Sequence, residues 1–476
     1  MPLGSRSQLA VIGGGPAGMT AALLLARGGH GVTLYERAAG LGGLWASRLD
    51  ADGRFLSDNS CKVYQPSYTT TPALMSLIGT DWRAHFVPRY DLTSDWLEPF
   101  VRDCSWRDLR ALAGAYLANR AGLGGFHEVS VDEFVRTREL TDACRAWMCA
   151  TALGGIAGTL RMTMWEFFHR IGTNVVEILA GTKGPLYWNE RPPNAPGGFV
   201  TIWHAALCRA GVEVRADTQV DKLEVHPEGL RLTTASGEEV TAGAVFLALP
   251  PPALARLLRT SDPALAEGFG APQSALGGLV RDSAYSHLGV TWSFSSELPN
   301  DLPLGGHNVR RGWHPILVQH PQYQPWLKPP ARTVVVASLA VDTEFRHHRL
   351  RTLASEHTPE ELAAIVWEDE RRIDPSLPEP LSAVITPSSS ATQITRQGPL
   401  PVSCLGGRVL LATNLHGRAP YFTASLEAAI QAGAIAATAF DGDLERLPMG
   451  RPAKLPWTVA GSAEQRPLRQ VVGATD

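Results

Sequence analysis

Three glycines near the start of the chain have the spacing of a dinucleotide-binding turn. The apolar run Leu9–Ile12 is typical of a buried parallel strand, and Gly13-x-Gly15-x-x-Gly18 follows it directly. Gly13 allows the tight turn, Gly15 leaves room for a pyrophosphate, and Gly18 allows the next helix to pack closely on the strand. The pattern predicts a helix over Met19–Arg27 whose N-terminus faces the phosphates.

A second strand and an acidic residue complete this motif. The run Val32–Tyr35 ends at Glu36, eighteen positions beyond Gly18, where a carboxylate can accept hydrogen bonds from both ribose hydroxyls. A glycine-rich turn that only packs a helix on a sheet is the alternative reading of the glycines alone. Strand, glycines, helix, second strand and acidic residue arrive here in order, which favours a nucleotide site.

The residues after Glu36 distinguish a flavin from a nicotinamide cofactor. The stretch Glu36-Arg-Ala-Ala-Gly-Leu-Gly42-Gly43-Leu-Trp45 resembles the extended FAD fingerprint of the flavin amine oxidase superfamily, which includes protoporphyrinogen oxidases and phytoene desaturases. The resemblance implies that Gly42 and Gly43 let the backbone reach the pyrophosphate and the flavin. Amine oxidases usually continue with Arg, whereas this chain has Leu44.

Two later segments resemble the other FAD-binding parts of the same superfamily. In the second, the resemblance implies that Val220 contacts the adenine through its backbone. In the third, Asn414 stands where the family commonly bonds the ribityl chain with Glu or Asp, and the Leu426 amide would point at the flavin from a helix that begins around Ala424. The residues implied to bind FAD are therefore Gly13, Gly15, Pro16, Ala17, Gly18, Glu36, Arg37, Gly42, Gly43, Leu44, Trp45, Val220, Asn414 and Leu426.

The resemblance implies an α/β fold with two interleaved domains. One is a discontinuous, three-segment Rossmann-like FAD-binding domain, and the other is an inserted α+β substrate domain built from a mixed sheet and a helical cap. We assign residues 1–79, 195–283 and 395–445 to the FAD-binding domain, 80–194 and 284–394 to the substrate-binding domain, and 446–476 to an extended tail.

Helical patterns over Trp106–Arg120, Val131–Thr137 and Asp142–Thr151 predict the cap. Ser130 and Thr141 are placed to begin two of these helices. We expect the helices of residues 80–195 to cover the sheet of the substrate domain.

Lys62 and Tyr64 lie in a segment that runs along the flavin in the superfamily. Relatives usually carry small residues there, so these two side chains are candidates for polar groups beside the isoalloxazine. An ordinary polar loop is the alternative.

The loop from Leu415 to Phe422 carries three more candidates and is about three residues longer than its amine oxidase counterpart. Arg418 can bind a substrate carboxylate bidentately, His416 can act as an acid or base near neutral pH, and Tyr421 can form a wall of the substrate cage. Packing or surface roles are equally compatible with the sequence.

Two marks of the amine oxidase subgroup are missing. The lysine that is hydrogen-bonded through water to flavin N5 would lie near Val290–Trp292, and the C-terminal cage aromatic would align with Ser425. Three functions therefore stay open. They are an FAD-dependent oxidase or dehydrogenase that acts on an amine, amino acid derivative or C–C bond in specialised biosynthesis, a redox-neutral isomerase or cyclase, and a non-catalytic FAD-binding protein. The Trp-rich substrate domain argues against the third.

Composition limits the remaining possibilities. The chain has 476 residues and 44% hydrophobic content, enough for a large core, and a net charge of -3 offers no field that attracts nucleic acid. Six cysteines without a CxxC pair predict free thiols and no metal site, and Cys404 lies too far upstream for covalent flavin attachment. We expect a cytoplasmic monomer or homodimer without a membrane span, with noncovalent FAD, a small-molecule substrate and O2 as electron acceptor.

Overall fold

The computed structural model describes most of the chain. The described residues are 8–65, 67–90, 102–155, 159–168, 171, 186–298, 312–341, 343–387, 391–392, 400–421 and 425–449. Phe422, Ala424 and most of the predicted tail, residues 450–476, lie outside them.

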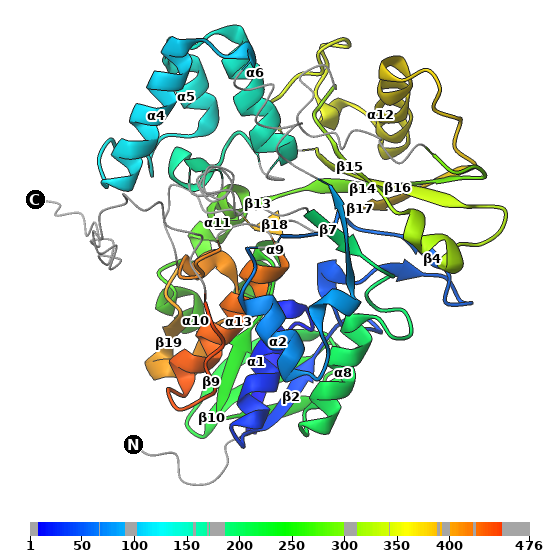
Figure 1. Ribbon diagram of the computed structural model, residues 1–476. Helices are drawn as coiled ribbons and strands as arrows, with labels where there is room; N and C mark the ends of the chain where they lie inside the picture. Colours follow the sequence, from blue (N-terminus) through cyan, green and yellow to red (C-terminus); the bar gives the residue numbers. More distant parts are fainter. Residues whose placement is uncertain are drawn as a thin grey trace, which may run out of the picture.

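A mainly parallel sheet forms the centre of the lower unit in Figure 1. Its described strands run in the order β19 (Ser403–Cys404), β20 (Val409–Leu411), β12 (Ala244–Leu247), β1 (Gln8–Ile12), β2 (Gly31–Tyr35) and β8 (Glu213–Arg215). Only the edge strand β19 pairs antiparallel to its neighbour. Strands β12 and β20 are buried along their whole length, as expected for parallel strands that are covered on both faces.

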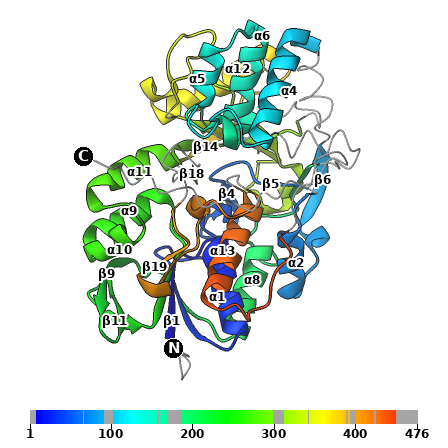
Figure 2. The same ribbon diagram turned by 90° about the vertical axis from the view of Figure 1, so that its left-hand side faces the viewer.

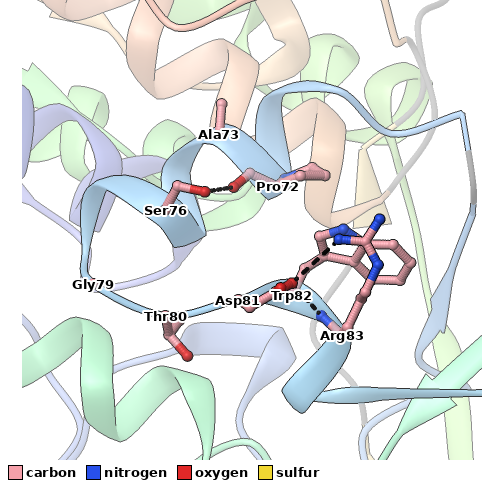
Figure 3. Close-up of a pocket in the computed structure, with 8 residues that line it drawn as sticks. All are labelled: Pro72, Ala73, Ser76, Gly79, Thr80, Asp81, Trp82 and Arg83. Carbon is pink, nitrogen blue, oxygen red and sulfur yellow. Dashed lines mark hydrogen bonds and ion pairs between the residues drawn. The ribbon is translucent and has the colours of Figure 1, made fainter.

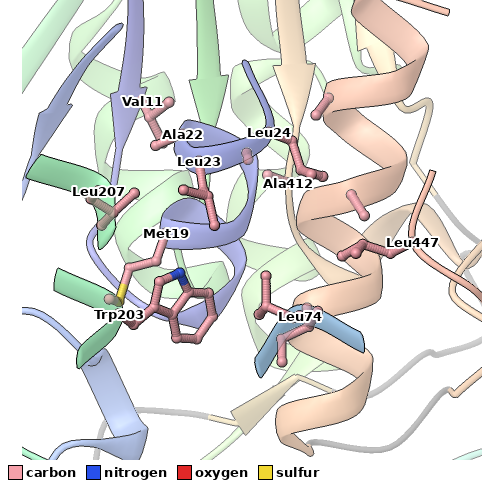
Figure 4. Packing of buried hydrophobic residues seen from close by; sticks show 14 of the residues in the cluster. Val11, Met19, Ala22, Leu23, Leu24, Leu74, Trp203, Leu207, Ala412 and Leu447 are labelled. Atoms are coloured by element: carbon pink, nitrogen blue, oxygen red, sulfur yellow. The ribbon is translucent and has the colours of Figure 1, made fainter. Parts of the chain in front are cut away.

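Helices cover one face of this sheet. Leu9 and Val11 point to that face and pack against α1 (Pro16–Arg27), α2 (Thr70–Leu77), α8 (Phe199–Arg209) and α13 (Leu426–Phe440). Figure 4 shows Met19, Leu23 and Trp203 packed together in this core. Helix α1 begins at Pro16, three residues before the predicted start, because proline is well suited to the first turn of a helix.

The opposite face has its own core. Ala10 and Ile12 point there, because successive residues of a strand alternate between its two faces. The covering elements are β9 (Val220–His226), β10 (Gly229–Thr234), β11 (Glu239–Ala242), α9 (Pro251–Thr260), α10 (Pro263–Gly268) and α11 (Leu276–Ser283).

The upper unit contains an antiparallel sheet. Its strands run in the order β15 (Ile316–Gln319), β16 (Thr333–Ala340), β14 (His287–Phe294) and β17 (Ser382–Pro387). Helix α12 (Pro359–Ile373) packs on it, and the ring centroid of Trp367 lies 5.4 Å from Trp292 and 4.8 Å from Phe294.

The cap helices α4 (Trp106–Arg120), α5 (Val131–Thr137) and α6 (Asp142–Ala150) form a separate cluster, visible in both views. Among the described residues, their shared core includes Ala340 at the end of β16 and Phe345 beyond it. Among the described residues, helix α12 packs on this sheet, and the expectation that the helices of residues 80–195 cover it stays a prediction. The predicted helix-start residues Ser130 and Thr141 are confirmed as N-caps.

Short strands connect the two units. Strand β5 (Val63–Tyr64) pairs with β7 (Leu186–Asn189), which also pairs with β6 (Phe86–Tyr90). The hairpin of β3 (Arg48–Leu49) and β4 (Phe55–Ser57) precedes β5. Residues from the first predicted FAD-binding segment thus join a sheet with strands from the predicted substrate domain, and the domain division itself stays a prediction.

Candidate functional site

The motif residues gather at one edge of the parallel sheet. Strands β1, β2, β12 and β20 all end there, so Gly13, Glu36, Ala248 and Ala412 follow neighbouring strands. The carboxyl edge of an open parallel sheet is where α/β folds bind nucleotides.

Backbone packing explains the first three glycines. Gly13 has φ +109, and a Cβ on it would lie 2.3 Å from the carbonyl oxygen of Ala248. A Cβ on Gly18 would lie 1.9 Å from the carbonyl oxygen of Gly13, so only glycine lets α1 approach the strand. A Cβ on Gly15 would meet only Gly43 Cα, at 3.9 Å. The space beside Gly15 is thus open to a ligand at the N-terminus of α1, where no side chain caps the helix.

Glu36 binds the same turn. Its Oε2 accepts a hydrogen bond from the Gly14 amide at 2.7 Å, and its Oε1 accepts one from the Ala38 amide at 2.9 Å. The amide of Thr218 donates to the Glu36 carbonyl at 2.8 Å. This contact places the segment that leads to Val220 beside Glu36. The neighbouring Arg37 is exposed.

The glycine pair lies directly over the turn. The Gly42 amide donates to the Gly14 carbonyl at 2.8 Å, and a Cβ on Gly43 would lie 2.9 Å from Gly15 Cα. Leu44 and Trp45 follow in a short 3-10 helix (Gly43–Trp45). Trp45 is buried, and its Nε1 has no hydrogen-bond partner among the described residues. Trp45 Nε1 lies beside Gly42 and Gly43 and can donate a hydrogen bond to a large polar cofactor bound there.

The third predicted FAD-binding segment also lies at this edge of the sheet. Asn414 begins a short 3-10 helix (Asn414–His416) after β20, and Leu426 is the buried first residue of α13. Helix α13 crosses α1 closely, because a Cβ on Gly433 would lie 2.1 Å from the carbonyl oxygen of Ala17. The structure thus assembles all three predicted segments around the N-terminus of α1.

Lys62 lies in a buried polar cluster. Its ammonium group donates to Asp58 Oδ1 and, at 3.3 Å, to Ser47 Oγ, while Ser47 Oγ donates to Asp58 Oδ1 at 2.6 Å. Burial lowers the pKa of Lys62, and the neighbouring Asp58 opposes that shift. The Asp58 amide donates to Thr291 Oγ1 on β14 at 3.3 Å. Strand β14 carries no lysine, yet the Lys62 cluster reaches the part of β14 where the family lysine was expected.

Tyr64 is a core residue in this structure. Its side chain is buried, and its ring stacks on Phe86 at 4.5 Å and on Trp82 at 5.0 Å. Burial raises the pKa of its phenol well above the ordinary value. These surroundings differ from those of an ordinary polar loop, and a role beside the cofactor stays a prediction.

A pocket of about 510 Å3 lies beyond this aromatic stack (Figure 3). It is lined by Pro72, Ala73, Ser76, Gly79, Thr80, Asp81, Trp82 and Arg83. The Arg83 guanidinium lies 4.8 Å from the Trp82 ring centroid, and the Arg83 amide donates to Asp81 Oδ1 at 2.9 Å. None of the predicted cofactor-binding residues lines this pocket, so it is separate from the dinucleotide site.

The loop after β20 holds the other candidates. His416 is buried, and its Nδ1 accepts a hydrogen bond from the Arg418 amide at 3.0 Å. Burial lowers the pKa of His416 to about 4, which favours the neutral imidazole, and its role as an acid or base stays a prediction. Arg418 is exposed, and its guanidinium has no partner among the described residues. Tyr421 is buried, with its hydroxyl 2.6 Å from Ser67 Oγ and 2.9 Å from Gln65 Oε1.

Sequence reasoning missed two carboxylates. Asp58 pairs with Lys62 in the connection between β4 and β5, and a spacing of four residues predicts such a pair only on a helix, so the sequence held no signal for it. Glu427 is buried and is the only charged residue in the apolar helix α13. That isolated charge was the available signal, but its partners come from a distant part of the chain.

This parallel sheet, its glycine turn and the attached antiparallel unit define a two-domain dinucleotide-binding oxidoreductase fold. The chain matches the NAD(P)-binding Rossmann-like domain over residues 11–77 and the flavin containing amine oxidoreductase family over residues 117–396. The second match spans more than half of the chain. The chain belongs to the flavin containing amine oxidoreductase family and is a flavin-dependent oxidoreductase.

Solved structures share this fold. Cyclohexylamine oxidase from Brevibacterium oxydans IH-35A is 15% identical, with a TM-score of 0.63 over 92% of this chain and 99% of that chain. Putrescine oxidase bound to putrescine is 13% identical, with a TM-score of 0.64 over 91% of this chain and 98% of that chain.

A curated relative matches only a short stretch. The oxidoreductase YgfK of Escherichia coli K12 is 61% identical over 41 residues, which is 9% of this chain and 4% of that protein. This chain therefore spans a small part of that relative's length. Within the described ranges, no helix combines the length and the apolar character needed to cross a bilayer.

Proposed function

We propose that this chain is an FAD-dependent oxidase that removes hydride from a C–H bond of a small amine or amino acid derivative and uses O2 as electron acceptor. The observation that carries the proposal is the family match together with the convergence of three FAD-type segments at one sheet edge. FAD, when bound, supplies the hydride acceptor. Two solved structures with the same fold are named as amine oxidases, which supports an amine as substrate.

The residues at the edge fit FAD held without a covalent bond. The turn at Gly15 and the N-terminus of α1 would hold the pyrophosphate, Glu36 the ribose, and Trp45 Nε1 is a free donor beside the glycine pair. Cys404 is buried in the core on the far face of the sheet, and burial raises the pKa of its thiol to about 11. Such a thiol is a poor nucleophile for attachment to a flavin.

Lys62 is our candidate for the ammonium group that the family usually supplies from the strand matching β14. It is fully buried, and its partner Asp58 contacts Thr291 on that strand. Asp58 favours the ammonium form of Lys62 against the effect of burial, and an ammonium group there would stabilise the negative charge that develops on oxygen during reduction. This argument supports the oxidase over the redox-neutral alternative.

The double variant Lys62→Met/Asp58→Asn tests this role, because it removes both buried charges together. We expect the flavin content and the anaerobic reduction by substrate to stay near the wild-type level, while reoxidation by O2 slows by about tenfold or more. Stopped-flow reoxidation measures this effect. Lys222→Met, an exposed lysine paired with Glu224, is the matched control. An unchanged reoxidation rate in the double variant would remove Lys62 from the proposal.

Arg418 is our candidate for binding a substrate carboxylate, since its guanidinium is exposed and has no partner among the described residues. Arg418→Ala is expected to raise KM about tenfold or more for amines that carry a carboxylate, and to leave amines without one unaffected. Equal effects on both substrate classes would contradict the assignment.

The function itself is tested under anaerobic conditions. The purified yellow protein is mixed with pooled amines, amino acids and their derivatives, flavin bleaching is followed at about 450 nm, and air is then admitted while peroxide is measured. Bleaching followed by peroxide is expected. Product formation without lasting bleaching or oxygen uptake would instead identify the redox-neutral isomerase or cyclase.

A further inference from the structure

Glu427 is a buried carboxylate without a cation beside it. It is the second residue of α13, and no lysine, arginine or histidine pairs with it among the described residues. Its Oε1 accepts from the amides of Thr69 at 3.0 Å and Thr70 at 2.8 Å. Its Oε2 accepts from the amide and the hydroxyl of Thr71 at 2.8 and 2.7 Å. These amides belong to Thr69, the N-cap of α2, and to the first two residues of that helix. Amides at the start of a helix have no acceptor within it, so they can stabilise the negative charge of Glu427.

Gln431 extends this network to the loop after β20. One turn further along α13, its Nε2 donates to Glu427 Oε1 at 3.1 Å, and its Oε1 accepts from the Tyr421 amide at 2.9 Å. The Tyr421 hydroxyl then contacts Ser67, just before α2. Gln431 Nε2 also donates to Thr70 Oγ1 at 3.1 Å, which closes a ring of hydrogen bonds through Glu427, Gln431 and Thr70. The Glu427 network, which we define as Thr69, Thr70, Thr71, Glu427, Gln431 and Tyr421, thus joins two distant segments of the chain.

The loop from Leu415 to Tyr421 is fixed at both ends. Leu415 and His416 are buried at the start, where His416 accepts the Arg418 amide, and Tyr421 is held by the Glu427 network at the end. Arg418 lies between these two anchors and is exposed.

We infer that Glu427 is a positioning residue that, through Gln431 and Tyr421, fixes the loop presenting Arg418 to the substrate. The inference rests on the substrate-binding role proposed above for Arg418. A buried carboxylate is stable only while its donors stay in place, so the network favours a single arrangement of the loop.

Hydrogen exchange of the flavin-loaded protein tests the positioning directly. Glu427→Gln keeps the size of the side chain but replaces one acceptor oxygen with a donor. We expect faster amide exchange in the peptides that contain Thr69–Thr71 and Tyr421. Glu445→Gln, an exposed carboxylate paired with Arg27, is the matched control and should leave exchange unchanged. Exchange at the wild-type rate in Glu427→Gln would overturn the inference.

Gln431→Met supplies a second test if Glu427→Gln fails to fold. It cuts the link between Glu427 and Tyr421 and removes the contact of Gln431 Nε2 with Thr70 Oγ1, while the amides at the start of α2 keep the Glu427 carboxylate. We expect faster exchange at Tyr421 and a smaller change at Thr69–Thr71, whose amides keep Glu427 as acceptor. Wild-type exchange at Tyr421 would also overturn the inference.

Kinetics test the link to Arg418. With equal flavin content, Glu427→Gln should raise KM for a carboxylate-bearing amine about tenfold with little change in kcat, and should add less than about twofold in an Arg418→Ala background. Effects that multiply in the double variant would refute a role through Arg418. If no carboxylate-bearing amine reduces the wild-type flavin, the proposed role of Arg418 fails. The hydrogen-exchange experiment then still decides whether Glu427 positions the loop.

Discussion

Glu36 combines two roles at the residue scale. Its carboxylate already accepts the Gly14 and Ala38 amides, and it stands where the ribose of a bound dinucleotide is expected. Removing it would loosen the turn and delete a ligand contact at the same place.

We therefore expect Glu36→Ala to purify with much less flavin than the wild type. The ratio of flavin to protein absorbance measures this loss. Glu228→Ala, in the exposed turn between β9 and β10, is the control and should keep the wild-type ratio. Full flavin content in Glu36→Ala would show that the ribose contact is assigned to the wrong residue.

Two buried histidines predict that the free energy of unfolding depends on pH. Burial lowers the pKa of His287 and of His416 from 6.5 to about 4. Between about pH 6.5 and 4, the unfolded chain binds protons that the folded chain does not, so the free energy of unfolding falls as the pH falls. The loss is at most about 3 kcal/mol for each residue.

Urea denaturation at pH 7.5 and pH 5 measures this effect. We expect His416→Gln to lose less stability between the two conditions than the wild type, because glutamine does not titrate. His226→Gln on strand β9 is the control, since that side chain is only partly buried. An equal loss in His416→Gln and the wild type would mean that folding does not lower the pKa of His416.

The crossing of α1 and α13 is the critical contact at the element scale. Both helices begin beside the proposed FAD site, and Gly433 lets them approach closely over Ala17. A methyl group there would push α13 away from α1 and so move the start of α13 relative to the sheet edge.

Gly433→Ala should lower the free energy of unfolding by about 1–3 kcal/mol and weaken flavin retention. The matched change Gly114→Ala lies inside α4 with open space around it, so it should stabilise the protein by about 0.5–1 kcal/mol. Thermal unfolding with flavin fluorescence as a second signal compares the two variants. A neutral Gly433→Ala would mean that the helices separate at no cost.

On the scale of the whole molecule, a noncovalent flavin would link cofactor binding to stability. Acid precipitation should release all of the yellow colour into the supernatant, because Cys404 is buried in the core on the far face of the sheet. Free FAD at about 100 times its Kd should add about 2.7 kcal/mol to the free energy of unfolding of the apoprotein. Colour retained in the precipitate would show a covalent bond.

The local parts of the fold follow from the sequence. Gly13, Gly15, Gly18 and Glu36 act over short spacings, and the helix starts at Ser130 and Thr141 depend only on hydrogen bonds within a turn. The family follows from the same kind of local pattern, repeated in three segments.

Tertiary structure decided the surroundings of the candidate residues. The sequence suggested His416 as an acid or base and Tyr64 as a polar group beside the flavin. Burial lowers the pKa of His416 to about 4 and places Tyr64 in an aromatic core. Glu427 accepts four of its hydrogen bonds from residues 356 to 358 positions away. Spacing along a chain fixes turns, caps and helix faces, whereas burial and the partner of a charge depend on which distant segments pack against it. For that reason the sequence alone determined the cofactor class, and only the folded chain determined which side chains have partners.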